Sequence, residues 1–145
     1  MKFIKFIKKS YYYFFYKIYH SIWYTSNAFG GESLISSKTS LVILALETWG
    51  LFSLTNYYTI YTKTFTELTI SMPVVYIPCI ILFVFNYFTI HYKDKWKQYN
   101  NEFDNYSKRK NRIAGWIVFG IILLIISNLI YSFYLMSEID WSKYR

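Results

Sequence analysis

Glu47 is the residue whose type and position most strongly suggest chemistry. It interrupts an apolar run that covers residues 41–46 and continues over residues 49–54. An ionised carboxylate in the middle of a membrane-spanning helix costs about 2.5–3.5 kcal/mol on insertion scales, so such a group faces protein or water. Two later apolar runs reach the same depth near Asn86 and Gly120. We therefore expect Glu47, Asn86 and Gly120 to share one layer between helices.

The sequence leaves three interpretations of Glu47 open. It is a neutral structural acid that is hydrogen-bonded to Asn86 or Tyr87, or it is a carboxylate that lines an aqueous pore. The third interpretation is a proton relay, although no chain of ionisable partners is visible around it.

Other small and polar residues inside the apolar runs favour contacts between helices. Asn128 is expected to form an interhelical hydrogen bond, and Ser127 lies beside it. Gly50 and Gly120 allow two helix backbones to approach closely. Because a few short helices cannot enclose a pathway alone, these contacts favour a homo-oligomer.

The sequence lacks the motifs of common enzymes. HExxH, GxSxG, CxxC and a Gly-rich phosphate loop are all absent. His20 and His91 fall at predicted membrane interfaces without evident ligand partners. The single Cys excludes an internal disulfide and a multi-Cys metal site. We expect a protein that is not an enzyme and that uses neither a metal nor a cofactor.

The basic residues indicate an anionic partner. The formal net charge is +8, which favours lipid head groups, nucleotides or nucleic acid. Near the N-terminus, lysines and tyrosines can anchor a helix to anionic lipid or, alternatively, track phosphates while the rings stack on bases. A second cluster precedes the last apolar run, as a membrane anchor or as a phosphate site. The candidate residues are Lys2, Lys5, Lys9, Lys17, Lys108, Arg109, Lys110 and Arg112.

Membrane-spanning helices are the elements that must position these residues. Residues 68–92 and 113–137 carry no Lys, Arg, Asp or Glu, and each exceeds the roughly 20 apolar residues that cross a bilayer. Residues 39–62 are a third candidate. A soluble fold of 145 residues cannot bury two such helices on all sides. The predicted fold class is an all-α membrane protein with three transmembrane helices, in which Pro73 and Pro78 kink the second helix or delay its start.

The remaining segments are predicted to lie outside the spans. Residues 1–30 form a basic amphipathic interfacial helix, with an apolar face that includes Phe15 and Ile18 and an opposite face of lysines and tyrosines. Residues 93–112 form a basic helical loop. Its aromatic stripe, which packs on the N-terminal helix or on another subunit, consists of Trp96, Tyr99, Phe103 and Tyr106. Residues 138–145 form an external tail.

The distribution of positive charge predicts the topology. Of the 16 Lys and Arg residues, all but Lys63, Lys143 and Arg145 fall before the first span or between the second and third. Three spans put these two regions on one side of the membrane. The positive-inside rule makes that side the cytoplasm. We expect a multi-pass protein of the bacterial inner membrane with a cytoplasmic N-terminus.

The loop DKWKQYNNEFDNYSKRKNR, the last apolar run and the ending SEIDWSKYR resemble short multi-pass membrane proteins that are common in AT-rich bacteria. In size, charge and architecture, the whole chain also resembles small membrane effectors of bacterial anti-phage systems, such as the Hailong type. That resemblance rests on no motif and transfers no functional residue. It implies a homo-oligomeric channel or pore that is gated by a cytoplasmic nucleotide or nucleic-acid signal.

The alternative function is non-catalytic. The chain would then be an accessory or scaffold subunit of a membrane complex, or an immunity protein against a membrane toxin. In either case the expected partners are the lipid bilayer and other protein helices.

Overall fold

The protein is all α-helical in its computed structural model, which describes residues 2–28, 34–64 and 72–144. Within these ranges the order is α1 (Lys2–Ala28), α2 (Ile35–Thr62), α3 (Pro73–Asn86), the π-helical turn η1 (Tyr87–His91), the short 3₁₀ turn η2 (Tyr92–Asp94), α4 (Lys95–Asp104), α5 (Lys108–Ser137) and the 3₁₀ turn η3 (Trp141–Tyr144).

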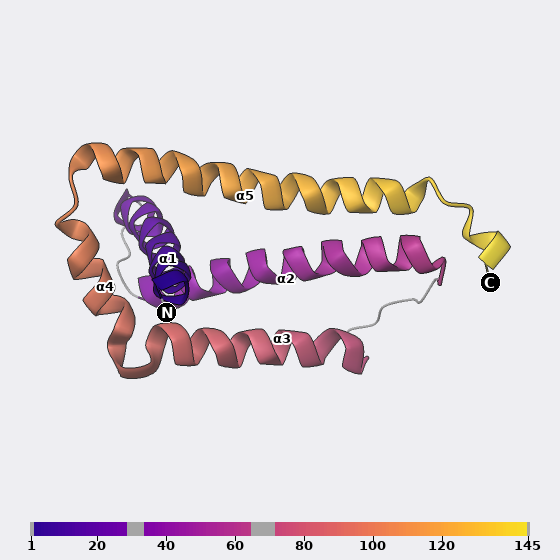
Figure 1. Ribbon diagram of the computed structural model, residues 1–145, viewed down its shortest axis with the longest axis horizontal. Coiled ribbons are helices and arrows are strands. Elements are labelled where there is room, and N and C mark those ends of the chain that lie inside the picture. The colour runs from indigo at the N-terminus through magenta and orange to yellow at the C-terminus, as the bar shows by residue number, and fades with distance from the viewer. Residues whose placement is uncertain (1, 29–33, 65–71, 145) are drawn as a thin grey trace.

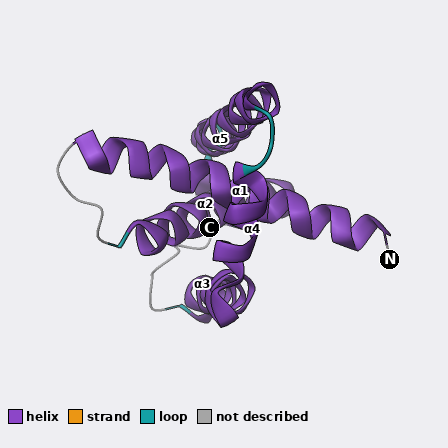
Figure 2. Ribbon diagram, turned by 90° about the vertical axis from the view of Figure 1, so that its left-hand side faces the viewer, coloured by secondary structure: helices purple, strands orange, loops and turns teal. Residues whose placement is uncertain are grey.

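The three long helices α2, α3 and α5 run along the long axis of the molecule, with α2 between α5 and α3 (Figure 1). Helix α1 lies across one end of this layer, and the view along the long axis shows it lengthwise (Figure 2). The short helix α4 lies at the same end as α1, and η3 lies at the opposite end. The all-α architecture matches the predicted fold class.

The core forms where α1 crosses the long helices. Phe15 and Ile18 of α1 pack with Ile43 and Leu46 of α2, and this cluster also takes in Ile90 of η1 and Val118 of α5. Phe15 and Ile18 belong to the apolar face that the sequence predicted for α1. The face therefore covers other helices at its centre, while Phe3, Ile4 and Ile7 near its N-terminal end stay exposed.

The helix boundaries differ from the predicted ones in informative ways. Helix α2 begins at Ile35 rather than at residue 39, and Ile35 and Thr39 are buried in its first turns. Helix α3 begins at Pro73, where a missing N–H costs nothing, and it continues through Pro78. This late start was predicted; residues 68–71 of the expected span lie outside the described part of the chain. The last turn of that span, from Tyr87, is π-helical.

The predicted loop over residues 93–112 is not one helix. Helix α4 ends at Asp104, and α5 begins at Lys108. Ser107 caps α5, because its side chain accepts a hydrogen bond from the backbone N–H of Lys110. The basic cluster over residues 108–112 thus belongs to the first turns of α5, which corrects the boundary expected at residue 113.

Two helical stretches, Val75–Asp104 and Lys108–Ser137, are long and apolar enough to cross a membrane. Few of the side chains in their apolar parts are covered by the rest of the chain. Phe83 and Phe85 of α3 are 60% and 52% exposed, and Leu124 and Ile130 of α5 are 68% and 63% exposed. These faces need lipid or another protein to cover them, because a monomer in water would leave this apolar surface hydrated.

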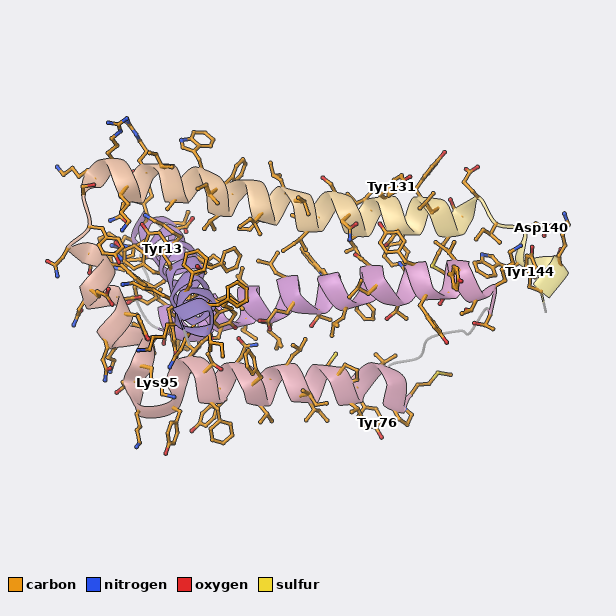
Figure 3. The ribbon with its side chains drawn as sticks, viewed as in Figure 1. Tyr13, Tyr76, Lys95, Tyr131, Asp140 and Tyr144 are labelled. Carbon is orange, nitrogen blue, oxygen red and sulfur yellow. The ribbon has the colours of Figure 1, made fainter. Side chains whose placement is uncertain are left out.

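Tyr13 and Lys95 lie at one end of the molecule, whereas Asp140 and Tyr144 lie at the other (Figure 3). The first end holds α1, α4 and the start of α5, which together carry 11 of the 16 Lys and Arg residues. The second end holds Lys63, whose ammonium lies 5.0 Å from the ring centre of Tyr144. The two basic regions of the sequence therefore gather at the same end of the fold, as the predicted topology requires.

Candidate functional site

Glu47 of α2 and Asn86 of α3 are joined by a hydrogen bond. Asn86 Nδ2 donates to Glu47 Oε2 at 2.6 Å and also to the carbonyl of Leu82 at 2.9 Å. This confirms that the two residues share one layer and that Asn86, not Tyr87, is the partner. Asn86 is 4% exposed, and Glu47 is half-buried.

Tyr11 of α1 completes this polar site, and the sequence did not predict its role. Its hydroxyl lies 3.0 Å from Glu47 Oε1 and 2.6 Å from Asn86 Oδ1. Burial raises the pKa of Tyr11 above its ordinary value. The phenol therefore keeps its proton. We name Tyr11, Glu47 and Asn86 the polar triad; it ties the crossing helix to both α2 and α3.

The number of protons in the polar triad bears on the state of Glu47. A tyrosine O–H has one proton, and here it lies near two acceptors. If Tyr11 donates to Asn86 Oδ1 and Asn86 donates to Glu47 Oε2, the contact between Tyr11 and Glu47 Oε1 still lacks a proton. A neutral carboxyl group supplies it by donating to the Tyr11 oxygen. The ring of three hydrogen bonds is thus complete when Glu47 is neutral.

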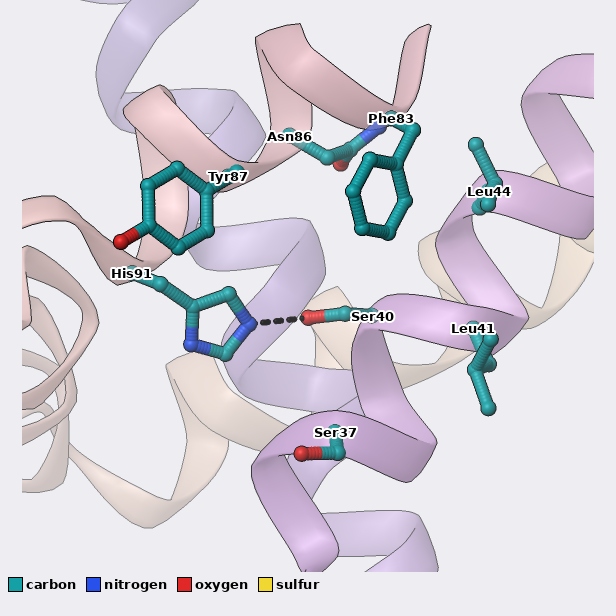
Figure 4. A pocket seen from close by; sticks show the side chains of 8 residues that line it. All are labelled: Ser37, Ser40, Leu41, Leu44, Phe83, Asn86, Tyr87 and His91. Carbon is teal, nitrogen blue, oxygen red and sulfur yellow. Dashed lines mark hydrogen bonds between the residues drawn. The ribbon is translucent and has the colours of Figure 1, made fainter. Parts of the chain in front are cut away.

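A cavity of about 440 Å³ lies beside the polar triad, between α2 and α3. Asn86 forms part of its wall, with Leu41, Leu44 and Phe83 around it. At one end, Ser40 Oγ lies 2.8 Å from His91 Nε2, and Ser37 points to the same side (Figure 4). The cavity therefore offers hydroxyl, imidazole and amide groups within an otherwise apolar lining.

Consecutive tyrosines of α1 reach different helices. While Tyr11 reaches α2 and α3, the Tyr12 hydroxyl donates to the carbonyl of Thr89 in η1. The Tyr13 hydroxyl donates to Asn111 Oδ1 of α5 at 2.5 Å, and that of Tyr16 donates to Asp104 of α4 at 2.8 Å. Successive residues of an α-helix point about 100° apart. The run YYYFFY therefore connects α1 to each of the other helices.

The aromatic stripe of α4 packs on α1, as one of the two predicted alternatives stated. Tyr12 stacks on Tyr99 with ring centres 3.9 Å apart, and Phe103 contacts the rings of Tyr13 and Tyr16 edge-on. This packing covers two of the α1 tyrosines that the nucleic-acid interpretation would use. Tyr12 and Tyr16 are only 1% and 4% exposed, so their rings are not free to stack on bases.

The predicted basic residues have different surroundings in the structure. Lys9 forms an ion pair with Glu102 of α4, which raises the pKa of the lysine, and Lys17 lies 5.1 Å from the ring centre of Tyr16. The Lys110 ammonium lies 3.4 Å from the ring centre of Tyr106. Exposed residues without such a partner in the described ranges are Lys5, Lys108, Arg109 and Arg112; the side chain of Lys2 lies outside the description.

Helices α2 and α5 are joined by two polar pairs near the other end of the fold. The Tyr57 hydroxyl donates to Asn128 Oδ1 at 2.8 Å, which confirms Asn128 as an interhelical residue. Asn56 Nδ2 donates to Ser132 Oγ at 3.0 Å. The second pair was not predicted, although a signal existed: Asn56 and Ser132 lie at nearly equal distances from the outer ends of their helices.

Gly50, Gly120 and Ser127 do not join helices within one chain, contrary to their assignment as packing residues at these contacts. A methyl group added at Gly50 or Gly120 would meet no atom within 4 Å. Gly120 and Ser127 are exposed on α5. Gly120 therefore contributes no contact between helices to the layer of the polar triad. The sequence correctly placed these residues on helices but could not tell which helix face they occupy.

The chain matches no protein-family model, no curated protein and no solved structure. Within the described residues, no three His, Cys, Asp or Glu side chains come together as metal ligands would. What the protein does must therefore be argued from the polar triad, the cavity and the exposed apolar helices.

Proposed function

We propose that the chain is a three-span membrane protein that assembles into a homo-oligomeric channel or pore. Helices α2, α3 and α5 would cross the bilayer, and α1 and α4 would lie at the cytoplasmic side. The observation that carries the proposal is the polar triad, beside a cavity that Ser40, Asn86 and His91 help to line, in a layer of otherwise apolar helices. Intramembrane ionisable groups usually mark an ion pathway or its gate.

Assembly is supported by the surface of α5. Gly120 and Ser127 are exposed there, and the space beside Gly120 is open. Small residues let helices from different subunits approach closely in a membrane. Because α2 lies between α3 and α5 in a single layer, one chain does not surround a pathway. Several copies would have to do so.

Helix α1 is the proposed gating element. Its tyrosines form hydrogen bonds with α2, α3, η1, α4 and α5. Tyr11 is itself a member of the polar triad. A force applied to α1 or α4 from the cytoplasm would therefore act on Glu47 and Asn86. In the closed state we expect Glu47 to be neutral and held by Tyr11.

The cytoplasmic signal would be a nucleotide or an oligonucleotide, as in the anti-phage effectors that the chain resembles. A small cavity of about 180 Å³ between α1, α4 and α5 suits a phosphate-bearing ligand, because Lys9 and Lys110 line it with the ring of Tyr106. Binding there would compete with the ion pair between Lys9 and Glu102. This location replaces the buried Tyr12 and Tyr16 face as the proposed ligand surface.

Ion flux into liposomes tests the channel. Tyr11→Phe removes both hydrogen bonds of the Tyr11 hydroxyl from the polar triad and should raise basal flux about thirtyfold, the factor for two bonds of about 1 kcal/mol each. Tyr19→Phe is the matched control, since the Tyr19 hydroxyl has no hydrogen bond to a described residue. Gly120→Leu should abolish flux by disrupting the oligomer. A wild-type chain that is monomeric in detergent and gives no flux would refute the proposal.

The exposed helices also fit a second function. The apolar faces of α3 and α5 would equally suit an accessory, scaffold or immunity protein that binds helices of another membrane protein. In that case the wild-type chain would be monomeric when purified and would form a defined complex with a protein encoded beside it. Size measurement in detergent separates the two functions.

A further inference from the structure

The corner between α1 and α3 contains a groove that the channel proposal does not use. Its volume is about 420 Å³. Ile4 and Ile7 of α1 face Phe85 of α3 and Phe88 of η1 across it, and Lys8 and Lys95 belong to the same lining. The four apolar side chains are each more than half exposed. The groove is therefore an open apolar surface with two cations.

The positive charge of this groove is not neutralised by the chain itself. No acidic residue of the described part of the chain lines it. Lys8 is exposed and forms no ion pair or hydrogen bond within the described ranges. Among the described residues, the Lys95 ammonium donates to the carbonyl of Phe88 alone, at 3.3 Å, and lies 5.2 Å from the ring centre of Tyr92. Asp94, the nearest acid along the chain, pairs with Lys97 at 3.2 Å.

We infer that this groove binds one anionic phospholipid. The phosphate would lie between Lys8 and Lys95, and an acyl chain would cover Ile4, Ile7, Phe85 and Phe88. The inference rests on the proposed membrane orientation, in which α1 lies along the surface and α3 crosses the bilayer. In that orientation, a lipid head group would lie beside α1 at the membrane surface, and its acyl chain would extend along α3 into the bilayer. Charge decides the occupant, because a second copy of α1 would bring further lysines, and a free nucleotide would leave the apolar surface uncovered.

The bound lipid would act on the polar triad. Tyr11 and Tyr12 also line the groove, and their hydroxyls bind Glu47, Asn86 and the Thr89 carbonyl. A lipid in the groove would hold α1 against α3 and so favour the closed state. The lipid composition of the membrane would then regulate the proposed channel.

Native mass spectrometry of protein released from mixed nanodiscs tests the site. Wild type should retain phosphatidylglycerol in preference to phosphatidylcholine. Lys8→Gln and Lys95→Gln should each reduce that retention about fivefold, the factor expected for one lysine beside an anionic lipid. The control pair Lys38→Gln and Lys63→Gln removes the same charge from exposed positions outside the groove and should change retention little. Ile7→Trp, which fills the groove and keeps the charge, should also displace the lipid.

The outcomes separate this inference from the channel. Equal loss of phosphatidylglycerol in the groove variants and in the control pair would overturn the site, and so would equal retention of the two lipids by wild type. Flux measured on the same preparations tests the channel independently. A conducting oligomer without groove-dependent retention refutes the lipid site alone, whereas groove-dependent retention by a chain that gives no flux upholds the lipid site and counts against the channel.

Discussion

At the scale of single residues, Glu47 is held by two partners. Asn86 and Tyr11 come from different helices, and each binds one of its carboxyl oxygens. Leaving a buried polar group without a partner costs about 1–3 kcal/mol. Substitutions at Glu47 should therefore differ sharply according to whether they keep the hydrogen bonds.

The first prediction distinguishes a neutral Glu47 from an ionised one. Glu47→Gln can donate to Tyr11 and accept from Asn86, so it should preserve thermal stability, the oligomer and any conductance. Glu47→Leu should lower the unfolding free energy by about 1–3 kcal/mol, because Asn86 loses an acceptor. Both are measured by thermal unfolding in detergent and by flux. A large shift of selectivity towards anions in Glu47→Gln would show instead that an ionised Glu47 lines the pathway.

The second prediction concerns His20 of α1. Burial lowers its pKa below the ordinary 6.5, and Asp104, whose carboxylate lies 3.3 Å away, partly opposes that shift. An NMR titration should find His20 protonated only below pH 6.5. Asp104→Asn should lower the pKa further, and Lys17→Met should raise it, because a nearby positive charge is removed.

The sign of the pH effect follows from the lowered pKa. Below pH 6.5 the unfolded chain binds a proton at His20 more readily than the folded chain does. Stability from this residue is therefore present above pH 6.5 and lost as pH falls through the folded pKa. Thermal stability should therefore fall as the pH is lowered below 6.5, and His20→Gln should reduce that fall. If stability instead rose as the pH was lowered, and His20→Gln removed the rise, the lowered pKa of His20 would be wrong.

At the scale of elements, α1 and α4 behave as a pair that is attached to the layer of long helices. Tyr12, Tyr16 and Phe103 form a buried aromatic cluster between them. The attachment to the long helices uses tyrosine hydroxyls and the apolar side chains of Phe15 and Ile18. Weakening the packing between α1 and α4 should therefore leave the layer of long helices folded.

The third prediction tests this pair. Phe103→Ala should lower the unfolding free energy by about 3–5 kcal/mol, because Phe103 is 1% exposed and its ring is packed on α1. The control is Phe133→Ala on α5, where the ring is 55% exposed and should contribute much less in detergent. Hydrogen exchange should show that the Phe103 variant opens α1 and α4 first. Equal losses in the two variants would mean that α4 does not hold α1.

At the scale of the whole molecule, the two ends of the helical layer differ in charge. Lysines and arginines gather around α1, α4 and the start of α5, while Lys63 and Lys143 lie at the end that holds η3. This asymmetry predicts orientation in a membrane.

The fourth prediction is the orientation itself. In a Cys79→Ala background, Asn101→Cys should be labelled only from the cytoplasm and Ser142→Cys only from outside. Asn101 and Ser142 are both exposed, whereas the neighbouring Asn100 is buried and would react poorly. Cell-impermeant maleimide labelling of intact cells and of inverted vesicles measures this. Labelling of both positions from one side would rule out three spans.

The sequence alone determined the properties that depend on local composition. The length of the uncharged stretches predicted the two apolar helices. The basic segments that alternate with the spans predicted that positive charge gathers at one end of the fold. Glu47 and Asn86 were paired correctly, because residues at equal depth on neighbouring helices meet when both lie on the facing sides of those helices. Asn128 was likewise identified by its polarity in an apolar run.

The tertiary structure decided which faces meet. Tyr11 is 36 residues from Glu47 and 75 from Asn86 along the chain, so no local pattern could connect them. The amphipathic pattern of α1 predicted one covered face, but crossing helices cover the tyrosine face as well. The glycines failed as packing sites within the chain for the same reason. Helical periodicity fixes which residues share a face, and only the packing of distant helices fixes what that face contacts.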